Sequence, residues 1–346
     1  MNAPLKHLLQ ILYLEDIRDR PYPDWAVQDV LPRKGLAMLY GPSGCGKSLL
    51  VVDFAAKAAL ALPWFERPVR ERLRVTLFAL EGKDGLRKRL EAWEKHNAKP
   101  FPGDVTYVLD SFSLGDDEQV DRAVRKIALE GGTDVVVIDT LNRASPLADE
   151  NRSADMGKLI RGATRLQEGL DCLVVLVHHT GKDESRGPRG HSSLYAALDV
   201  VVEVNRKDEA RYWRLVKSKD GVDGVSRSFD LVGVQVALDE YGTPITSAAV
   251  VELEDEAPAE ERKVRLGKHQ SAVLDELRAY LLAQEQEAQA SPDTPIGLPY
   301  DEALQRALPV VDVAPSRKTE RTKDALDSLL KSDHLRLVDG LVRLSE

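Results

Sequence analysis

A glycine-rich run constrains the fold of this chain more than any other feature. Residues 41–48 contain Gly at the first, fourth and sixth positions and end in Lys47 and Ser48, between apolar segments at 35–40 and 49–60. This spacing lets backbone N–H groups surround phosphate oxygens, and the start of a helix adds its positive end. Lys47 would reach the β- and γ-phosphates, and the Ser48 hydroxyl would bind Mg²⁺. The pattern predicts a strand, a phosphate-binding loop and a helix, with ATP and Mg²⁺ as ligands.

Cys45 lies inside this loop, beside Lys47 and the helix start, and both neighbours favour a thiolate. This placement predicts that thiol reagents inactivate nucleotide hydrolysis and that ATP protects against them; a small buried residue without reactivity is the alternative. The residues expected to contact the nucleotide are Gly41, Pro42, Ser43, Gly44, Cys45, Gly46, Lys47, Ser48 and Leu49.

Short apolar runs alternate with longer segments of helical periodicity from about residue 35 to 250. Continuous Val, Leu and Ile runs are typical of strands buried on both faces of a parallel sheet, and the alternation predicts a doubly wound α/β domain. The partly alternating run 227–236 indicates antiparallel strands at the sheet edge. The expected buried strands are Gly35–Tyr40, Val75–Leu80, Val105–Leu109, Val135–Ile138, Leu173–Val177, Val200–Val204 and Tyr212–Val216.

Two of these strands end in carboxylates. Asp139 follows 135–138, where it would hold the Mg²⁺ shell through water; an Asp that merely ends a strand is the alternative. Glu81 follows 75–80, and we expect that strand to lie next to the strand before the phosphate loop. A carboxylate there could polarise an attacking water. A surface Glu in a turn is the alternative.

The end of the chain forms a separate unit. The acidic, proline-containing stretch 251–262 predicts a linker between an ATPase core at 1–250, which includes a short N-terminal segment, and a domain at 263–346. Helices are expected at Lys268–Leu282, Tyr300–Leu308 and Arg317–Leu330, with Ser316 as the N-cap of the last, followed by a hairpin around Asp339 and Gly340. Three helices plus a hairpin resemble a winged helix. The basic cluster Arg317, Lys318, Arg321 and Lys323 suits DNA contacts or a protein-docking face.

Charge and cysteine content narrow the function classes. The chain has 48 Lys and Arg against 57 Asp and Glu, a formal net charge of −9, which excludes a free-standing basic nucleic-acid coat. Nucleic-acid contacts would need a local basic patch or a surface concentrated by oligomerisation. Two cysteines and no apolar run of membrane-spanning length favour a reduced, cytoplasmic protein without a membrane partner.

The ordered motifs resemble a RecA-fold ATPase core and, more narrowly, the RepA-type hexameric replicative helicases of plasmids and phages and their DnaB-like relatives. The resemblance covers about residues 20–245. It implies an ATP-driven motor that acts on single-stranded DNA, a homo-oligomer that is a hexamer in this family, and plasmid or phage replication proteins as partners. The segments that carry it are Trp25–Pro32, Gly35–Gly41, Phe78–Gly82, Val137–Leu141, Asp149–Asn151, His178–Lys182 and Arg189–Ser193.

The resemblance also implies residue roles. Glu81 would be the catalytic base, and His179 would end the strand next to that of Asp139 and sense the γ-phosphate. Arg189, and after it Lys219 of the pair with Lys217, would complete the site of a neighbouring subunit.

Arg89 would stack on adenine, as an arginine of the family does near that position. The loops after Asp139, with Arg143, and after His179, with Lys182 and Arg186, would face DNA.

Two alternatives to the helicase function remain. One is a recombinase-like filament, and the other is a loader or switch ATPase without strand separation.

Overall fold

The computed structural model describes residues 11–146, 148–149, 152–180, 192–207, 210–253, 267–290, 297–331, 334–338 and 340–344. The chain forms two compact units, residues 1–258 and 259–346. Among the described helices, none combines the length and the apolar character that crossing a bilayer requires.

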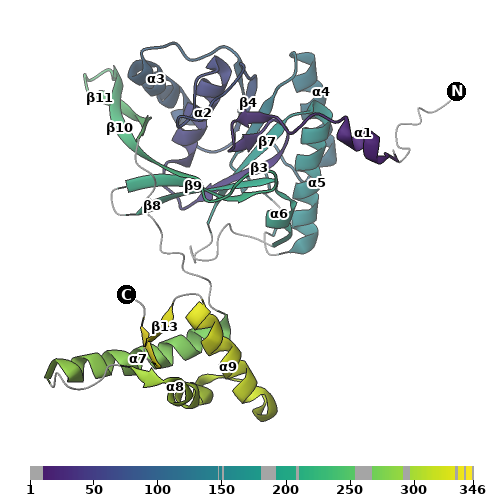
Figure 1. The fold of residues 1–346 in the computed structure, drawn as a ribbon. Helices are drawn as coiled ribbons and strands as arrows, with labels where there is room; N and C mark the ends of the chain where they lie inside the picture. Colours follow the sequence, from purple (N-terminus) through teal and green to yellow (C-terminus); the bar gives the residue numbers. More distant parts are fainter. Residues whose placement is uncertain are drawn as a thin grey trace. The chain divides into compact units, whose positions relative to one another are not determined.

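A nine-stranded sheet forms the centre of the first unit (Figure 1). Its order is β11-β10-β9-β8-β3-β7-β6-β4-β5, in which β8 through β5 run parallel and β9, β10 and β11 are antiparallel additions at one edge. All seven predicted strands are present, and the antiparallel edge also agrees with the sequence. The strands are β3 (Gly35–Gly41), β4 (Val75–Ala79), β5 (Val105–Val108), β6 (Val135–Asp139), β7 (Leu173–His179), β8 (Val200–Lys207), β9 (Ala210–Ser218), β10 (Ser226–Leu238) and β11 (Pro244–Glu252).

Helices cover both faces of the sheet, as a doubly wound fold requires (Figure 1). On β3, Ala37 and Leu39 pack in one core with α2, whereas Leu36 and Met38 pack in the other with α4 and α5, because successive strand residues point to opposite faces. The other elements of this unit are α1 (Leu14–Arg18), β1 (Trp25–Val27), β2 (Leu31–Pro32), α2 (Lys47–Leu60), the 3₁₀ turn η1 (Lys83–Gly85), α3 (Leu86–Asn97), α4 (Asp117–Leu129), α5 (Ser153–Leu170) and α6 (Ser192–Ala197).

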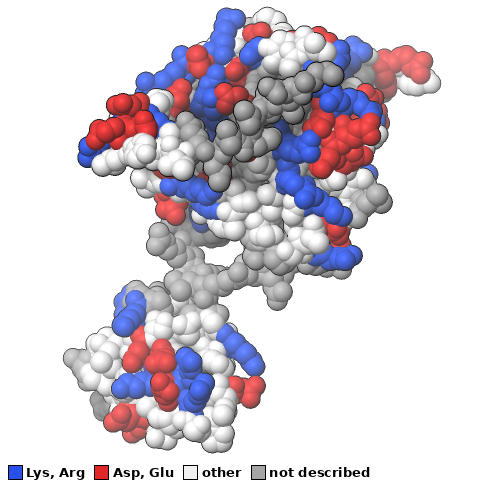
Figure 2. Space-filling view, turned by 90° about the vertical axis from the view of Figure 1, so that its right-hand side faces the viewer, with Lys and Arg blue, Asp and Glu red and all other residues white. Residues whose placement is uncertain are grey.

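Basic and acidic side chains are interspersed on the face that carries α4 and α5 (Figure 2). Arg165 of α5 pairs with Asp117 and Asp121 of α4, and Arg122 pairs with Glu118 within α4. Charges paired in this way are largely neutralised. These pairs therefore balance basic and acidic charges between α4 and α5 on this face.

The predicted start of the linker belongs to the sheet. Val251 and Glu252 lie in β11, and the Glu252 carboxylate accepts a hydrogen bond from the Phe65 N–H (2.8 Å) and pairs with Lys57. The Glu252 side chain thus forms an ion pair inside the first unit. The prediction of a linker that starts at residue 251 is wrong. Residues 254–266 lie outside the described part of the chain.

The second unit has the three helices and the hairpin that the sequence predicts. Its core includes Leu277, Leu326, Leu329 and Val342. Its elements are α7 (Lys268–Ala290), β12 (Leu298–Pro299), α8 (Tyr300–Ala307), the 3₁₀ turn η3 (Leu308–Val310), α9 (Pro315–Lys331), β13 (Leu335–Val338) and β14 (Leu341–Leu344), with sheet order β12-β14-β13. That this unit is a winged helix stays a prediction.

One helix boundary in this unit differs from the prediction. The helix α9 begins at Pro315, so Ser316 lies inside the helix and is not its N-cap. Proline suits the first helical position because its fixed φ matches the helix and its missing N–H would have no partner there.

Candidate functional site

The glycine-rich loop joins the end of β3 to the start of α2. Gly44 and Gly46 have φ values of +80° and +107°, which favour glycine over other residues. A Cβ on Gly41 would stand 1.8 Å from the Val204 carbonyl oxygen of β8, so the loop leaves the sheet where only glycine fits. These positions explain the glycine spacing in the sequence.

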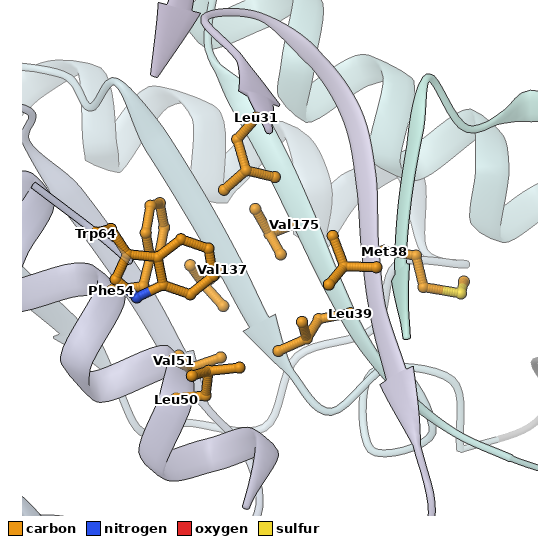
Figure 3. Close-up of a pocket in the computed structure, with 10 residues that line it drawn as sticks. Leu31, Met38, Leu39, Leu50, Val51, Phe54, Trp64, Val137 and Val175 are labelled. Atoms are coloured by element: carbon orange, nitrogen blue, oxygen red, sulfur yellow. The ribbon is translucent and has the colours of Figure 1, made fainter. Parts of the chain in front are cut away.

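The helix that follows the loop is anchored on the sheet. Leu50, Val51 and Phe54 of α2 point toward Leu39 and Val175 around an apolar cavity of about 20 Å³ (Figure 3). A void of this size lined by aliphatic and aromatic carbon offers a water or ligand no polar partner. The cavity is therefore part of the packing that holds the N-terminus of α2 against the end of β3.

Lys47 is held beside the loop backbone. Its Nζ donates hydrogen bonds to the carbonyl oxygens of Gly41 (2.8 Å) and Pro42 (2.6 Å), and only 5% of the residue is exposed. Burial lowers the pKa of Lys47, and the charges of Asp139 and Glu81 act in the opposite direction. A cation is thus fixed where the sequence expects phosphates to bind.

Cys45 does not have the electrostatics that the sequence suggested. The thiol is 2% exposed, and burial raises its pKa by more than Lys47 lowers it. A buried thiol with a raised pKa is a poor nucleophile. The structure therefore favours the alternative, a small buried residue without reactivity, because desolvation outweighs the neighbouring charge.

Asp139 ends β6 and lies beside Ser48. Burial raises the pKa of its carboxylate, and the neighbouring Ser48 hydroxyl and the Arg89 charge act in the opposite direction. Its Oδ1 is buried and accepts no hydrogen bond from any described residue. A hydroxyl and a carboxylate with a free oxygen are hard oxygen ligands, which fit Mg²⁺. The described residues contain no group of three or more His, Cys, Asp or Glu that could bind a metal, so Mg²⁺ would take its other ligands from phosphate and water.

Glu81 follows β4, whose position in the sheet differs from the prediction. β4 is not next to β3, because β7 and β6 lie between them. The ends of β4 and β6 are nevertheless joined, since the Glu81 N–H donates to the Asp139 carbonyl oxygen (3.2 Å). The Thr140 hydroxyl donates to Glu81 Oε2 (2.9 Å), and the side chain of Glu81 is 44% exposed. Glu81 is thus oriented by Thr140 and open to solvent, so that water can reach its carboxylate.

Thr140 was not singled out from the sequence. The only signal for it was its position directly after Asp139, at the end of a strand that carries a candidate metal ligand.

His179 joins the two halves of the site. It ends β7, which pairs with β6 on one side and with β3 on the other, so that His179 lies opposite Gly41 in the register. Its Nε2 is 3.8 Å from Glu81 Oε2. The structure places this side chain between the loop strand and the Glu81 carboxylate, and β7 does lie next to the strand of Asp139 as predicted.

Lys219 does not lie with these residues. Lys219 follows β9, and its Nζ pairs with Asp199 Oδ1 (2.8 Å) just before β8. Asp199 also accepts a hydrogen bond from the Leu36 N–H at the start of β3, whereas the phosphate loop follows the end of β3. Lys219 therefore lies at the opposite end of the strands from the phosphate loop of its own chain. Arg189, and with it Lys182 and Arg186, lies outside the described residues. Arg143 is exposed in the turn after β6.

The profile of a protein family described as "AAA domain" matches residues 5–185, more than half of the chain. The chain belongs to this AAA domain family. Together with the glycine-rich loop and the parallel sheet, the family makes the first unit a RecA-like P-loop ATPase core. Such families bind ATP, usually with Mg²⁺, and this membership indicates ATP hydrolysis. No curated protein matches the chain.

Several solved structures are similar to this chain. They include the RadB recombinase (15% identity, TM-score 0.41, 57% of this chain and 87% of that one) and the KaiC-like protein PH0186 of Pyrococcus horikoshii OT3 (16%, TM-score 0.43, 60% and 90%). A third is the structure of an isolated ATPase domain (15%, TM-score 0.43, 62% and 84%).

Proposed function

We propose that this protein is an ATP-hydrolysing ring motor that acts on single-stranded DNA, a replicative-type DNA helicase that resembles the RepA-type enzymes. In this proposal it works in the cytoplasm, as a homo-oligomer of hexameric type, with plasmid or phage replication proteins as candidate partners. The ordered sequence motifs and the convergence of Lys47, Asp139, Glu81 and His179 at one sheet edge support it.

Each side chain of the site has a distinct task in this mechanism. Lys47 and the loop N–H groups bind the β- and γ-phosphates, and Ser48 and Asp139 hold Mg²⁺, which would neutralise charge on those phosphates. Glu81 takes a proton from the attacking water, and Thr140 keeps its carboxylate in position. Since Glu81 is not buried, water reaches it without rearrangement of the sheet.

The contact between His179 and Glu81 is the observation that carries the motor proposal. His179 is the last residue of β7, and the segment after it, 181–191, is one of the two that the resemblance directs toward DNA. A residue that touches the catalytic base at one end and continues into a DNA-binding loop at the other can couple hydrolysis to DNA movement. A simple ATP-binding switch does not require this link.

A strand-displacement assay on forked DNA tests the proposal. We expect ATP-dependent separation by the wild-type chain and none by Lys47→Ala or Glu81→Gln, which remove phosphate binding and proton transfer respectively. ATP hydrolysis without strand separation, combined with filaments in electron micrographs, would favour the recombinase-like alternative. Hydrolysis with neither rings nor filaments would favour a loader or switch ATPase that signals through residues 263–346.

A further inference from the structure

Arg89 lies in the first turns of α3, and its side chain turns back over the residues that follow Glu81. Its Nη2 is 2.7 Å from the place where a Cβ on Gly82 would stand and 3.5 Å from the corresponding place on Gly85. Gly82 has a φ of +59° and its carbonyl accepts the Gly85 N–H, so the chain makes a tight turn here. The absence of side chains at Gly82 and Gly85 makes room for the guanidinium.

The neighbouring cations of α3 are directed differently. Arg87 is 89% exposed and pairs with Glu91 one turn along the helix (2.7 Å), and Lys88 is exposed. Arg89 is half-buried, and within the described part of the chain it makes no hydrogen bond or ion pair. A guanidinium carries five N–H donors, and those of Arg89 are not among the buried atoms that lack a hydrogen bond, so solvent reaches them. A half-buried cation whose donors are open to solvent can bind an anion.

Arg89 lies at the hydrolytic end of the site. Its guanidinium packs on Gly82, the residue directly after Glu81, and the Glu81 N–H is hydrogen-bonded to the Asp139 carbonyl oxygen (3.2 Å). The guanidinium therefore lies near the carboxylates that would hold Mg²⁺ and activate water. A base-stacking residue would instead lie at the far end of the nucleotide, several bonds beyond the α-phosphate.

We propose that Arg89 binds the terminal phosphate of ATP within its own chain, from the turn that follows Glu81. Guanidinium groups match phosphate oxygens in geometry and charge, and the contact would form with a triphosphate but not with a diphosphate. This inference rests on ATP binding at the P-loop, and it gives Arg89 a different role from the adenine contact that the family resemblance implies.

Equilibrium binding to three ligands tests the proposal without relying on turnover. AMP-PNP carries base and three phosphates, ADP carries base and two, and inorganic tripolyphosphate carries no base. In Arg89→Ala we expect AMP-PNP to bind about 10- to 100-fold more weakly, the range for one lost charge-assisted hydrogen bond. Tripolyphosphate affinity should fall in parallel and ADP affinity should change little. Arg87→Ala, which removes an exposed arginine two residues away, should bind all three as the wild type does.

Other outcomes would overturn the inference. Equal losses for AMP-PNP and ADP with tripolyphosphate unaffected would assign Arg89 to the base, and no loss for any ligand would make it a surface cation. If Arg89→Ala does not fold, Arg89→Gln, which keeps most of the side-chain length, replaces it. Weaker binding of AMP-PNP with unchanged binding of ADP would then support the proposal. A wild-type chain that fails to bind AMP-PNP would contradict the ATP site itself, a failure distinct from that of Arg89.

Discussion

Lys47 and Glu81 differ in the species that each would contact. Lys47 would bind ground-state phosphates, so Lys47→Ala should abolish ATP binding; Glu81 would act only on the attacking water, so Glu81→Gln should bind ATP normally and lose turnover. Fluorescent-nucleotide titration together with phosphate release separates the two effects. Hydrolysis by Glu81→Gln at the wild-type rate would show that another group is the base.

The positions of the polar residues in the site were easier to predict from the sequence than the pKa shifts of the groups around them. Lys47, Ser48 and Asp139 could be predicted because motif spacing and strand ends are local features. Thr140 could not, because its role depends on a hydrogen bond to Glu81 across two strands. The direction of the Cys45 pKa shift could not be predicted, because burial, which a short motif does not reveal, outweighs the nearby cation.

A second residue-scale prediction concerns Asp53, which is 1% exposed on α2. It accepts a hydrogen bond from Trp93 Nε1 (3.0 Å) and pairs with Lys57 (3.4 Å), while the charge of Glu252 opposes its ionisation. Burial raises its pKa from 3.8 to about 6, so the folded state binds the proton more tightly than the unfolded state. The contribution of Asp53 to the unfolding free energy is therefore fully present below about pH 4 and declines as pH rises toward 6.

The variant Asp53→Asn removes this titration and can keep the Trp93 hydrogen bond. A shift of this size corresponds to about 3 kcal/mol, which is an upper limit for the decline. We expect the unfolding free energy of Asp53→Asn, relative to wild type, to rise between pH 4 and 6 in urea denaturation. A difference that is independent of pH would mean that Lys57 keeps Asp53 ionised throughout.

At the scale of elements, α5 offers two glycines with opposite environments. A Cβ on Gly162 would stand 2.0 Å from the Leu114 carbonyl oxygen, whereas Gly157 is exposed and has no atom of another element within 4 Å of its Cβ position. Gly162→Ala should destabilise the chain by about 1–3 kcal/mol through overpacking. Gly157→Ala should stabilise it by about 0.5–1 kcal/mol, because alanine favours the helix. Thermal unfolding of both variants checks this, and two equal shifts would contradict the packing of α5 on the loop before α4.

Strand positions were predictable because buried parallel strands are continuous apolar runs, as β6 and β7 are. The order of the strands was less predictable than their positions. The predicted placement of β4 next to β3 was wrong, because apolar periodicity carries no information on which strands pair. The two-residue strand β12 was not expected, since a Leu-Pro pair is too short to give a periodic signal.

At the scale of the whole molecule, the proposed ring requires a cation supplied by a neighbouring subunit. Lys219 lies at the sheet edge away from its own phosphate loop, so a role in catalysis would have to be in another chain. Lys219→Ala should bind ATP and turn over slowly, by a factor on the order of 10³ if it acts as such a cation. Arg189→Ala should behave in the same way if Arg189 has that role.

Mixing variants distinguishes action in a neighbour from action in the same chain. Lys47→Ala keeps the cation and Lys219→Ala or Arg189→Ala keeps the phosphate loop, so mixed rings would contain some complete interfaces. If Lys219 or Arg189 acts on the neighbouring subunit, mixtures that contain its variant should hydrolyse ATP faster than either variant alone. Lys88→Ala, which changes an exposed lysine, is the control and should keep full activity. Strictly additive activities, with subunit exchange confirmed, would contradict that assignment.

Coupling of ATP hydrolysis to single-stranded DNA is the central claim, and steady-state hydrolysis with and without a DNA oligonucleotide tests it most directly. We predict that single-stranded DNA raises kcat in the wild-type chain, and that Glu81→Gln shows no turnover in either condition. His179→Ala should hydrolyse ATP at a basal rate that DNA no longer stimulates, because the link between Glu81 and the following loop is lost. A wild-type rate that is the same with and without DNA, in a chain that binds DNA, would contradict the account.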